Sequence, residues 1–474
     1  MQMEGSSIVP DGPKDSLWAI LKEAVRGSER DFTQGSLWTA IVLLSVPMIL
    51  EMSMESLFAI VDIFFVAKLG AEAVAVVGLT ESVMALVYAV AIGLSIGATA
   101  MVARRTGEKD TEGAAKAAAH IIYVGILVSL VMSVIGIVFA HEFLVLLGGD
   151  AHVVELGTPF MRIMLGGNAV VVGLFLLNAI FRGAGDAAIA MRVLWLANIL
   201  NIILSPCLIF GVWIFPELGV TGAAVGTTIG RGVGVLYAAW RMFSPGGRIH
   251  VHRASWNLDP ALLWRIIKLS STAVLQFLIA TASWSALVRV VSGFGSEAIA
   301  GYVISLRVVM FALLPSVGLS NAAATLVGQN LGAGRPDRSE SSVWKAAFVN
   351  AGFLGVVGLI FIAFSHGIIG FFTSEPAVVA YGTDSLHIIA YGFVFYAFGM
   401  VLETAFNGAG DTWTPTWLNL FIFWIFEIPL AYLLAYHFGM GPHGVFWAIT
   451  AAFSLLAVVS ALLFRRGKWK QKVV

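Results

Sequence analysis

The sequence predicts an all-α membrane protein with twelve transmembrane helices in two six-helix lobes that form a parallel repeat. Three observations support this prediction: a composition poor in charge, apolar blocks long enough to cross a bilayer, and an internal duplication. Of the 474 residues, 59% are hydrophobic and only 12% are charged, whereas a soluble domain carries about 25% charged residues. Such a chain cannot cover a water-facing surface in the ordinary way.

The apolar blocks are about 20 residues long or longer, which is the length of helix that spans a ~30 Å hydrocarbon core. We count twelve, at 38–66, 74–102, 115–140, 155–180, 188–213, 220–243, 263–291, 297–327, 343–365, 381–405, 413–437 and 443–464. The connections are short except for the polar stretch 244–262. The chain therefore divides into a tail (1–37), a first lobe (38–243), a linker (244–262), a second lobe (263–464) and a basic tail (465–474).

Charge and cysteine content exclude several classes of protein. The formal net charge is zero, so no basic surface for nucleic acid is expected. One cysteine, Cys207, cannot form an internal disulfide or a multi-cysteine metal cluster, and we expect it to be a buried small side chain.

In the first tail, Leu17, Ile20, Leu21 and Val25 share helical spacing. That stretch is either a short helix on the membrane surface or a loosely structured tail.

The distribution of lysine and arginine predicts the orientation. The loops 103–116, 181–192, 241–265 and 331–345 and the C-terminal tail are rich in arginine or in both residues. The alternate loops at 141–154, 214–219, 292–296, 366–380 and 438–443 contain neither, and only Lys68 lies on that side. Because basic loops stay in the cytoplasm, we expect a multi-pass protein of the cell membrane with both termini and the linker cytoplasmic.

The two halves of the chain are a duplication. FRGAGD at 181–186 returns as FNGAGD at 406–411, and the same shift of 225 residues places GAEA at 70–73 over GSEA at 295–298 and GLS at 93–95 over GLS at 318–320. Chance does not hold one offset over so many positions. Loops predicted to be cytoplasmic align with each other, so the repeat is parallel, and transporters built this way bind substrate between the halves.

The repeated hexapeptide is predicted to be structural. Each copy follows the fourth helix of its lobe, where glycine tolerates the left-handed turn that ends a helix. We expect Gly183, Gly185, Gly408 and Gly410 to shape these corners. The aspartate that ends each copy can cap the following helix.

The ordered set of motifs resembles the multidrug and toxic compound extrusion (MATE) family over essentially the whole chain past residue 38. The matching stretches are GAGD after the fourth and tenth helices, SVPMIL at 46–51, the VD of FAIVDIFFVAKLG, ARRTGEKD at 103–110, GVTGAA at 219–224 and EIPLAYLLA at 427–435. The resemblance implies export of amphipathic, often cationic organic compounds, driven by inward flow of protons or sodium ions. It implies no enzyme activity and no cofactor, and we expect a monomer whose partners are small organic substrates and membrane lipid. In agreement, the sequence has no GxxxxGK[ST] phosphate loop.

Three carboxylates on the first helix are the main candidates for ion coupling. At about 100° per residue, Glu55 lies about 40° and Asp62 about 20° from Glu51, so all three share one stripe about 16 Å long. A charged side chain costs about 2.5–3.5 kcal/mol to place inside a bilayer, so three acids on one stripe are not expected to face lipid. We expect the stripe to face a cavity, where it would form a cation path. Pro47, one turn before the stripe, removes a backbone hydrogen bond and permits a bend.

The resemblance assigns further roles in the first lobe. Asp62 matches the first-helix aspartate that carries coupling in the family, and Asn201 and Thr227 match polar residues near it, which together suggest a sodium site. Asn178 is a candidate for the same cavity. Alternatively, these polar residues are hydrogen-bonding links between helices. The family's archaeal members have an aspartate where this chain has Ser205, so Glu51 or Glu55 is the candidate replacement.

The second lobe offers fewer candidates. Gln276 and Glu403 are predicted to line a cavity, and Glu427 is expected to neutralise Arg307 or Arg289 across helices. An alternative function is a flippase for lipid-linked precursors, which needs cationic residues around its cavity. We counted Arg162, Arg289 and Arg307 as the intramembrane arginines, which leaves the charge mainly acidic. A membrane-embedded prenyltransferase is excluded because the sequence has no DDxxD motif.

Overall fold

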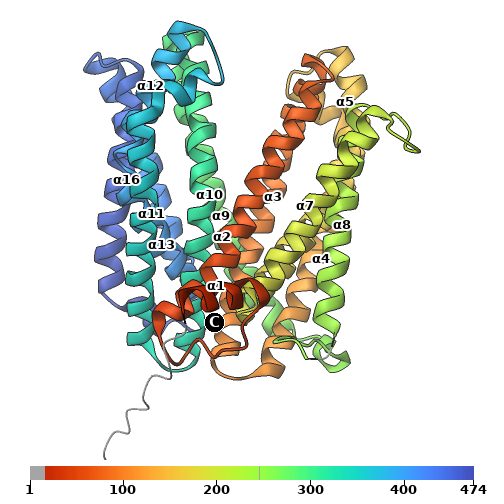
Figure 1. Ribbon diagram of the computed structural model, residues 1–474, viewed down its shortest axis with the longest axis vertical. Coiled ribbons are helices and arrows are strands. Elements are labelled where there is room, and N and C mark those ends of the chain that lie inside the picture. Colours follow the sequence, from red (N-terminus) through yellow and green to blue (C-terminus); the bar gives the residue numbers. More distant parts are fainter. Residues whose placement is uncertain (1–15, 245) are drawn as a thin grey trace, which may run out of the picture.

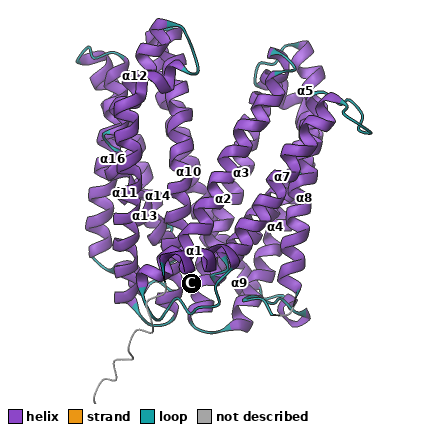
Figure 2. Ribbon diagram, viewed as in Figure 1, coloured by secondary structure: helices purple, strands orange, loops and turns teal. Residues whose placement is uncertain are grey.

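The computed structural model describes residues 16–244 and 246–474, and within these residues helices are the only regular secondary structure (Figure 2). All twelve predicted spans are present. In the first lobe they are α2 (Leu37–Ala67), α3 (Ala71–Gly107), α4 (Thr111–Leu146), the pair α5 (Ala151–Gly166) and α6 (Asn168–Ala184), α7 (Ala187–Phe210) and α8 (Val220–Phe243). A short helix, α1 (Leu17–Arg26), precedes them, and the linker holds one turn of 3₁₀ helix, η1 (Arg253–Trp256).

The second lobe repeats this plan. Its spans are α9 (Pro260–Val291), α10 (Ser296–Gly332), α11 (Pro336–Gly370), the pair α12 (Pro376–Ala390) and α13 (Phe393–Gly408), a compound eleventh span and α16 (Pro442–Arg465). The eleventh span joins α14 (Trp413–Asn419) and α15 (Ile428–Tyr432) through the π-helical segments η3 (Leu420–Glu427) and η4 (Leu433–His437). Short 3₁₀ turns lie at η2 (Ser292–Phe294) and η5 (Lys468–Gln471).

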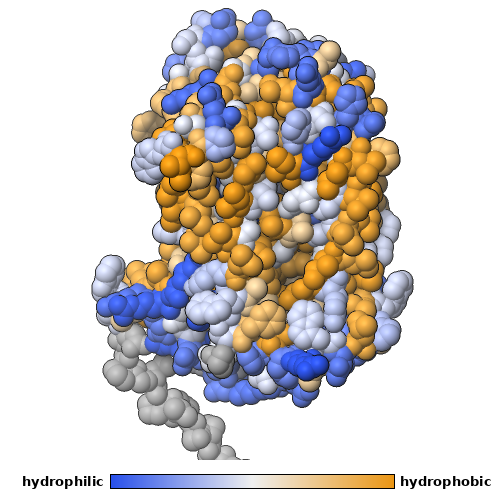
Figure 3. All heavy atoms as spheres, turned by 90° about the vertical axis from the view of Figure 1, so that its right-hand side faces the viewer, coloured by the Kyte–Doolittle hydropathy of each residue, from blue (hydrophilic) through white to orange (hydrophobic). Residues whose placement is uncertain are grey.

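Length and composition mark ten of the described helices or helix pairs as membrane spans, and α12 with α13, bent by 59°, makes an eleventh. The twelfth, α8, has 24 residues, enough to cross at about 1.5 Å per residue. It is less apolar because it holds several glycines, three threonines and Arg231. On the face drawn in Figure 3, apolar side chains cover the middle of the molecule and hydrophilic ones gather at its two ends, as expected for a membrane protein.

The repeated hexapeptides end their helices as predicted, but their aspartates do not cap the next ones. Gly185 and Gly410 adopt φ of +86° and +84°, in the left-handed region that favours glycine. Asp186 precedes α7 without a capping hydrogen bond from its side chain. Asp411 instead accepts from the Thr414 hydroxyl at 2.7 Å and pairs with the Lys472 ammonium at 3.1 Å. The capping prediction was wrong because Asp411 is used to hold the C-terminal tail.

The two lobes meet at one end of the molecule and diverge toward the other (Figure 1). We call the meeting end the closed end; α1, the linker 244–259 and the C-terminal residues 466–474 lie there. Glycines permit the close approach: a Cβ at Gly332 of α10 would overlap the Arg104 carbonyl of α3, and one at Gly107 of α3 would overlap the Gln329 carbonyl of α10. Gly183 and Gly408 likewise pack directly against neighbouring backbone.

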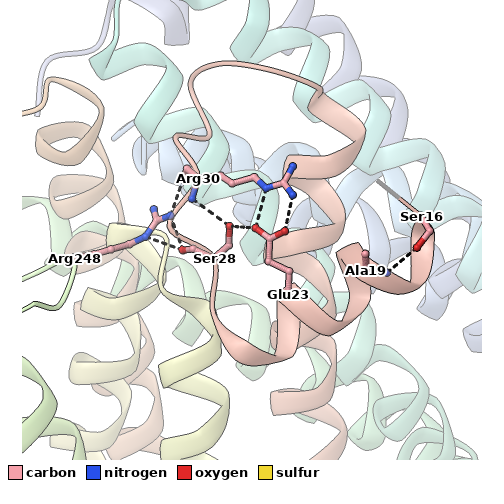
Figure 4. A network of polar contacts seen from close by, with 6 residues as sticks. All are labelled: Ser16, Ala19, Glu23, Ser28, Arg30 and Arg248. Atoms are coloured by element: carbon pink, nitrogen blue, oxygen red, sulfur yellow. Dashed lines mark hydrogen bonds and ion pairs between the residues drawn. The ribbon is translucent and has the colours of Figure 1, made fainter. Parts of the chain in front are cut away.

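The N-terminal segment 16–36, here called the strap, crosses the closed end. The expectation of a helix is confirmed by α1, whose Leu17 and Trp18 are exposed. Figure 4 shows the next residues folded back: Arg30 donates to Glu23 at 2.8 Å, and Arg248 of the linker donates to the carbonyls of Ser28 and Arg30. The strap is therefore attached to the first lobe and its linker.

The same segment is also attached to the second lobe. Arg338 of α11 donates to the carbonyls of Phe32, Gln34 and Gly35, and Arg335 donates to that of Thr33 at 2.7 Å. The strap thus joins the two lobes at the end where they meet.

We expect Arg338→Ala to loosen the strap from the second lobe, with the hydrogen bond from Arg335 to the Thr33 carbonyl left in place. Hydrogen bonds from a charged donor are worth about 1.5–3 kcal/mol, so hydrogen exchange of amides in 27–36 should accelerate about tenfold or more. Arg265→Ala, at an exposed position of α9, is the matched control and should leave exchange unchanged. Equal exchange in the two variants would contradict the attachment.

Candidate functional site

The predicted acidic stripe on α2 faces the other helices of the first lobe, and two of its three carboxylates are paired with arginine. Glu51 is 1% exposed. It accepts from Arg182 Nη1 of α6 at 2.7 Å and from Asn178 Nδ2 at 3.0 Å. In this conformation Glu51 is closed off from water, and Asn178 contributes to its ion pair. Pro47, one turn earlier, is buried within the continuous helix α2.

The second carboxylate, Glu55, is held by two neighbouring helices. Arg231 Nη2 of α8 and Asn198 Nδ2 of α7 each donate to it at 3.0 Å. The guanidinium of Arg231 is 2% exposed and stacks over Phe58, with 5.4 Å from Cζ to the ring centroid. A buried arginine needs such a counter-ion, because an isolated charge is costly in a low dielectric.

The third carboxylate, Asp62, is the only one of the stripe that lacks an ion pair among the described residues. Its Oδ1 is buried and has no hydrogen-bond partner there. Glu81 of α3 and Arg231 of α8 act on it electrostatically, and Arg307 of α10 acts in turn on Glu81. With Glu51 and Glu55 each paired with an arginine, Asp62 is the acid of the stripe whose negative charge no ion pair balances among the described residues.

Asn201 and Thr227 lie together, as predicted. Asn201 Nδ2 of α7 donates to Thr227 Oγ1 of α8 at 2.8 Å, and Ser205 donates to Asn201 Oδ1 at 3.2 Å. The helices approach closely because Gly230 faces the backbone of Ala197 and Asn201. This network fits the alternative of hydrogen-bonding links between helices. A sodium site that includes Asp62 stays a prediction.

The second lobe is built differently. Gln276 on α9 is 8% exposed with its amide oxygen unpaired, and Glu403 on α13 also has an unpaired, buried oxygen. Glu427, at the end of a π-helical segment, is buried next to Tyr302. The expected pairing of Glu427 with Arg307 or Arg289 was wrong, since neither arginine forms an ion pair with it in the part of the chain that the structure describes.

Sequence reasoning missed both buried arginines and Glu81. Arg182 belongs to the first repeated hexapeptide, which was interpreted only as a helix end. Arg231 lies within the apolar block 220–243 and should have been counted with the other intramembrane arginines. A charged side chain in an apolar block is itself the signal that would have found Arg231 and Glu81.

Comparison with known proteins identifies the family. The model of the MatE family matches residues 47–207 and 273–433, one segment in each lobe. The chain belongs to the MATE family. It is 25% identical over 445 residues to "Probable multidrug resistance protein YoeA" of Bacillus subtilis (93% of this chain, 96% of the relative). It is 26% identical over 441 residues to "Multidrug export protein MepA" of Staphylococcus aureus (91% and 94%).

Solved MATE structures share the fold. One described as an outward-facing conformation of a multidrug resistance MATE family transporter superposes with a TM-score of 0.87 at 26% identity, covering 93% of this chain and 98% of that one. A transporter of Pyrococcus furiosus, whose description reports a binding pocket of reversed polarity, superposes equally well (TM-score 0.87, 26% identity, 93% and 98% covered). The two-lobed repeat predicted from the sequence is confirmed.

Proposed function

We propose that this MATE protein is a secondary antiporter that exports amphipathic, cationic organic compounds in exchange for protons or sodium ions. The observation that supports this most directly is the state of Asp62. It is the stripe's carboxylate without an ion pair, so it can hold a coupling cation. Each ligand can shift the transporter between states only through its different affinity for them.

The proposal includes the location and the direction of transport. The closed end carries the basic loops, so it faces the cytoplasm of a cell whose plasma membrane the protein spans, with both termini inside. The arrangement in Figure 1 then corresponds to a state closed toward the cytoplasm. The protein works as a monomer, without a cofactor, on small organic substrates.

The buried charges favour this function over a flippase. Recognition of a pyrophosphate head would need positive charge left over in the cavity. Arg182 and Arg231 are balanced by Glu51 and Glu55, and Arg307 acts on Glu81, so the charge that remains is the negative charge of Asp62. A cationic substrate fits that balance better than an anionic one.

The test is efflux of a fluorescent organic cation from vesicles that contain the protein, with proton and sodium gradients imposed separately. Asp62→Asn should reduce gradient-driven efflux at least about tenfold, because a neutral amide cannot take up a proton and supplies no negative charge to balance a sodium ion. The control is Asp337→Asn, at an exposed position of the closed end, which should transport like the parent. Unchanged transport by Asp62→Asn would refute the assignment, and the gradient that drives the parent identifies the ion.

A further inference from the structure

The guanidinium of Arg231 is bonded to one carboxylate of α2, Glu55, and lies within electrostatic reach of a second, Asp62. It stacks on Phe58, which follows Glu55 by three residues and precedes Asp62 by four, so each acid is about one helical turn from this level. Arg231 is bonded to Glu55 at 3.0 Å and interacts electrostatically with Asp62. Both acids are therefore near the same positive charge.

Arg231 has hydrogen-bond donors to spare, and Asp62 has an acceptor that they could serve. Nε and Nη1 of Arg231 are buried and form no hydrogen bond of good geometry among the residues described, although the Tyr88 hydroxyl of α3 interacts with the guanidinium. Oδ1 of Asp62 is a buried acceptor that likewise has no hydrogen-bond partner among the described residues. Buried polar groups are normally paired, and an arginine can serve two carboxylates because its five N–H groups point in several directions.

We propose that Arg231 is a mobile internal counter-ion that competes with the coupling cation for Asp62. While Asp62 holds a cation, Arg231 pairs with Glu55, as in this structure. When the cation leaves, the guanidinium turns toward Asp62. This inference rests on the proposed function, since it takes Asp62 as the cation-binding group.

The charge balance explains why both acids are needed. Glu55, Arg231 and Asp62 together carry one net negative charge, so the cluster is neutral with one monovalent cation bound. Without the cation, the guanidinium pairs with Asp62, and neither acid is left without a hydrogen-bond donor. Asn198 donates to Glu55 and keeps it hydrogen-bonded when Arg231 turns away.

The other groups around the guanidinium are compatible with such a movement. Tyr88 of α3 offers a second ring, 5.9 Å from Cζ of Arg231, so the guanidinium has aromatic surface to move along. Glu81 of α3 adds negative charge near Asp62 and favours a positive charge there, whether from the cation or from Arg231. Because Arg231 belongs to α8 and both acids belong to α2, a change of partner changes the contact between these helices.

The experiment measures efflux as a function of the concentration of the coupling cation. In Glu55→Gln, Asp62 is the only counter-ion left for Arg231, so the half-saturating cation concentration should rise about tenfold or more while the maximal rate is kept at high cation. In Arg231→Gln the competitor is absent, and half-saturation should fall by a similar factor. In Glu55→Gln with Arg231→Gln the net charge equals that of the parent but the competitor is absent, so half-saturation should still fall about fivefold or more below the parent's, whereas an effect of net charge alone would leave it unchanged.

Opposite shifts in the two single variants support the proposal, because a structural defect would lower the rate at every cation concentration. Unchanged half-saturation in both single variants would overturn it. The double variant has no unpaired charge at these two positions, so it remains measurable if a single variant does not insert; a half-saturation within about twofold of the parent's would show an effect of net charge alone and would also overturn the proposal. If the parent shows no gradient-driven efflux, the proposed function itself fails. If the parent is active and Asp62→Asn is not, an unchanged half-saturation refutes the inference alone.

Discussion

Arg182→Gln is expected to destabilise the protein by about 3–5 kcal/mol, the usual effect of removing one partner of a buried ion pair. The substitution leaves Glu51, which is 1% exposed, as an uncompensated charge with only the Asn178 amide as donor. The free energy of unfolding, measured in mixed detergent micelles, should fall by that amount. The main-chain carbonyl of Arg182 accepts from Thr325 of α10, and the substitution leaves this contact between the lobes in place.

The control separates the charge from the shape of the side chain. Glu51→Gln combined with Arg182→Gln removes both charges and keeps two amides that can bond to each other. Its stability should return to within about 1 kcal/mol of the parent, because replacing a whole buried pair is often close to neutral. If the single and the double variant were equally unstable, the buried charge would not be the cause.

The fold was predictable because a bilayer allows few alternatives: backbone groups in lipid must be bonded within helices or closed barrels. Each block of apolar residues is therefore a span, and the repeat of FRGAGD and FNGAGD shows which helix of the first lobe corresponds to which helix of the second. The interruptions within spans were not predictable. The fourth span divides at Gly167, and the tenth bends by 59° between α12 and α13. Several apolar blocks contain glycines, and the sequence alone does not show which glycine bends its helix.

Half of the candidate site was predictable for a similar reason. The acids of α2 lie on one face because the helical period puts them there, and that argument needs only one helix. Their partners lie on other helices: Arg182 is 131 residues from Glu51, and Arg231 is 176 residues from Glu55. Contacts at such separations depend on tertiary packing, and a single sequence gives no pairing rule for them.

The closed end itself follows from the repeat. Gly107 of α3 contacts Gln329 of α10, and Gly332 of α10 contacts Arg104 of α3. The shift of 225 residues turns each of these contacts into the other, so the interface between the lobes is self-complementary, like that of a twofold dimer. Two glycines are needed because each helix brings its backbone against the other.

Gly332→Val is therefore expected to prevent this closure and to shift the population toward states in which the lobes separate at this end. Ala103, which is buried and packs against Gly328, reports the change: Ala103→Cys in a Cys207→Ser background should react with a maleimide at least about tenfold faster when Gly332→Val is added. Gly107→Val should have the same effect by the symmetry of the contact. Gly352→Val, where a Cβ would meet nothing within 4 Å, is the control. If the thiol reacted no faster in either interface variant than in the control, the glycine contacts would not be what holds the lobes together.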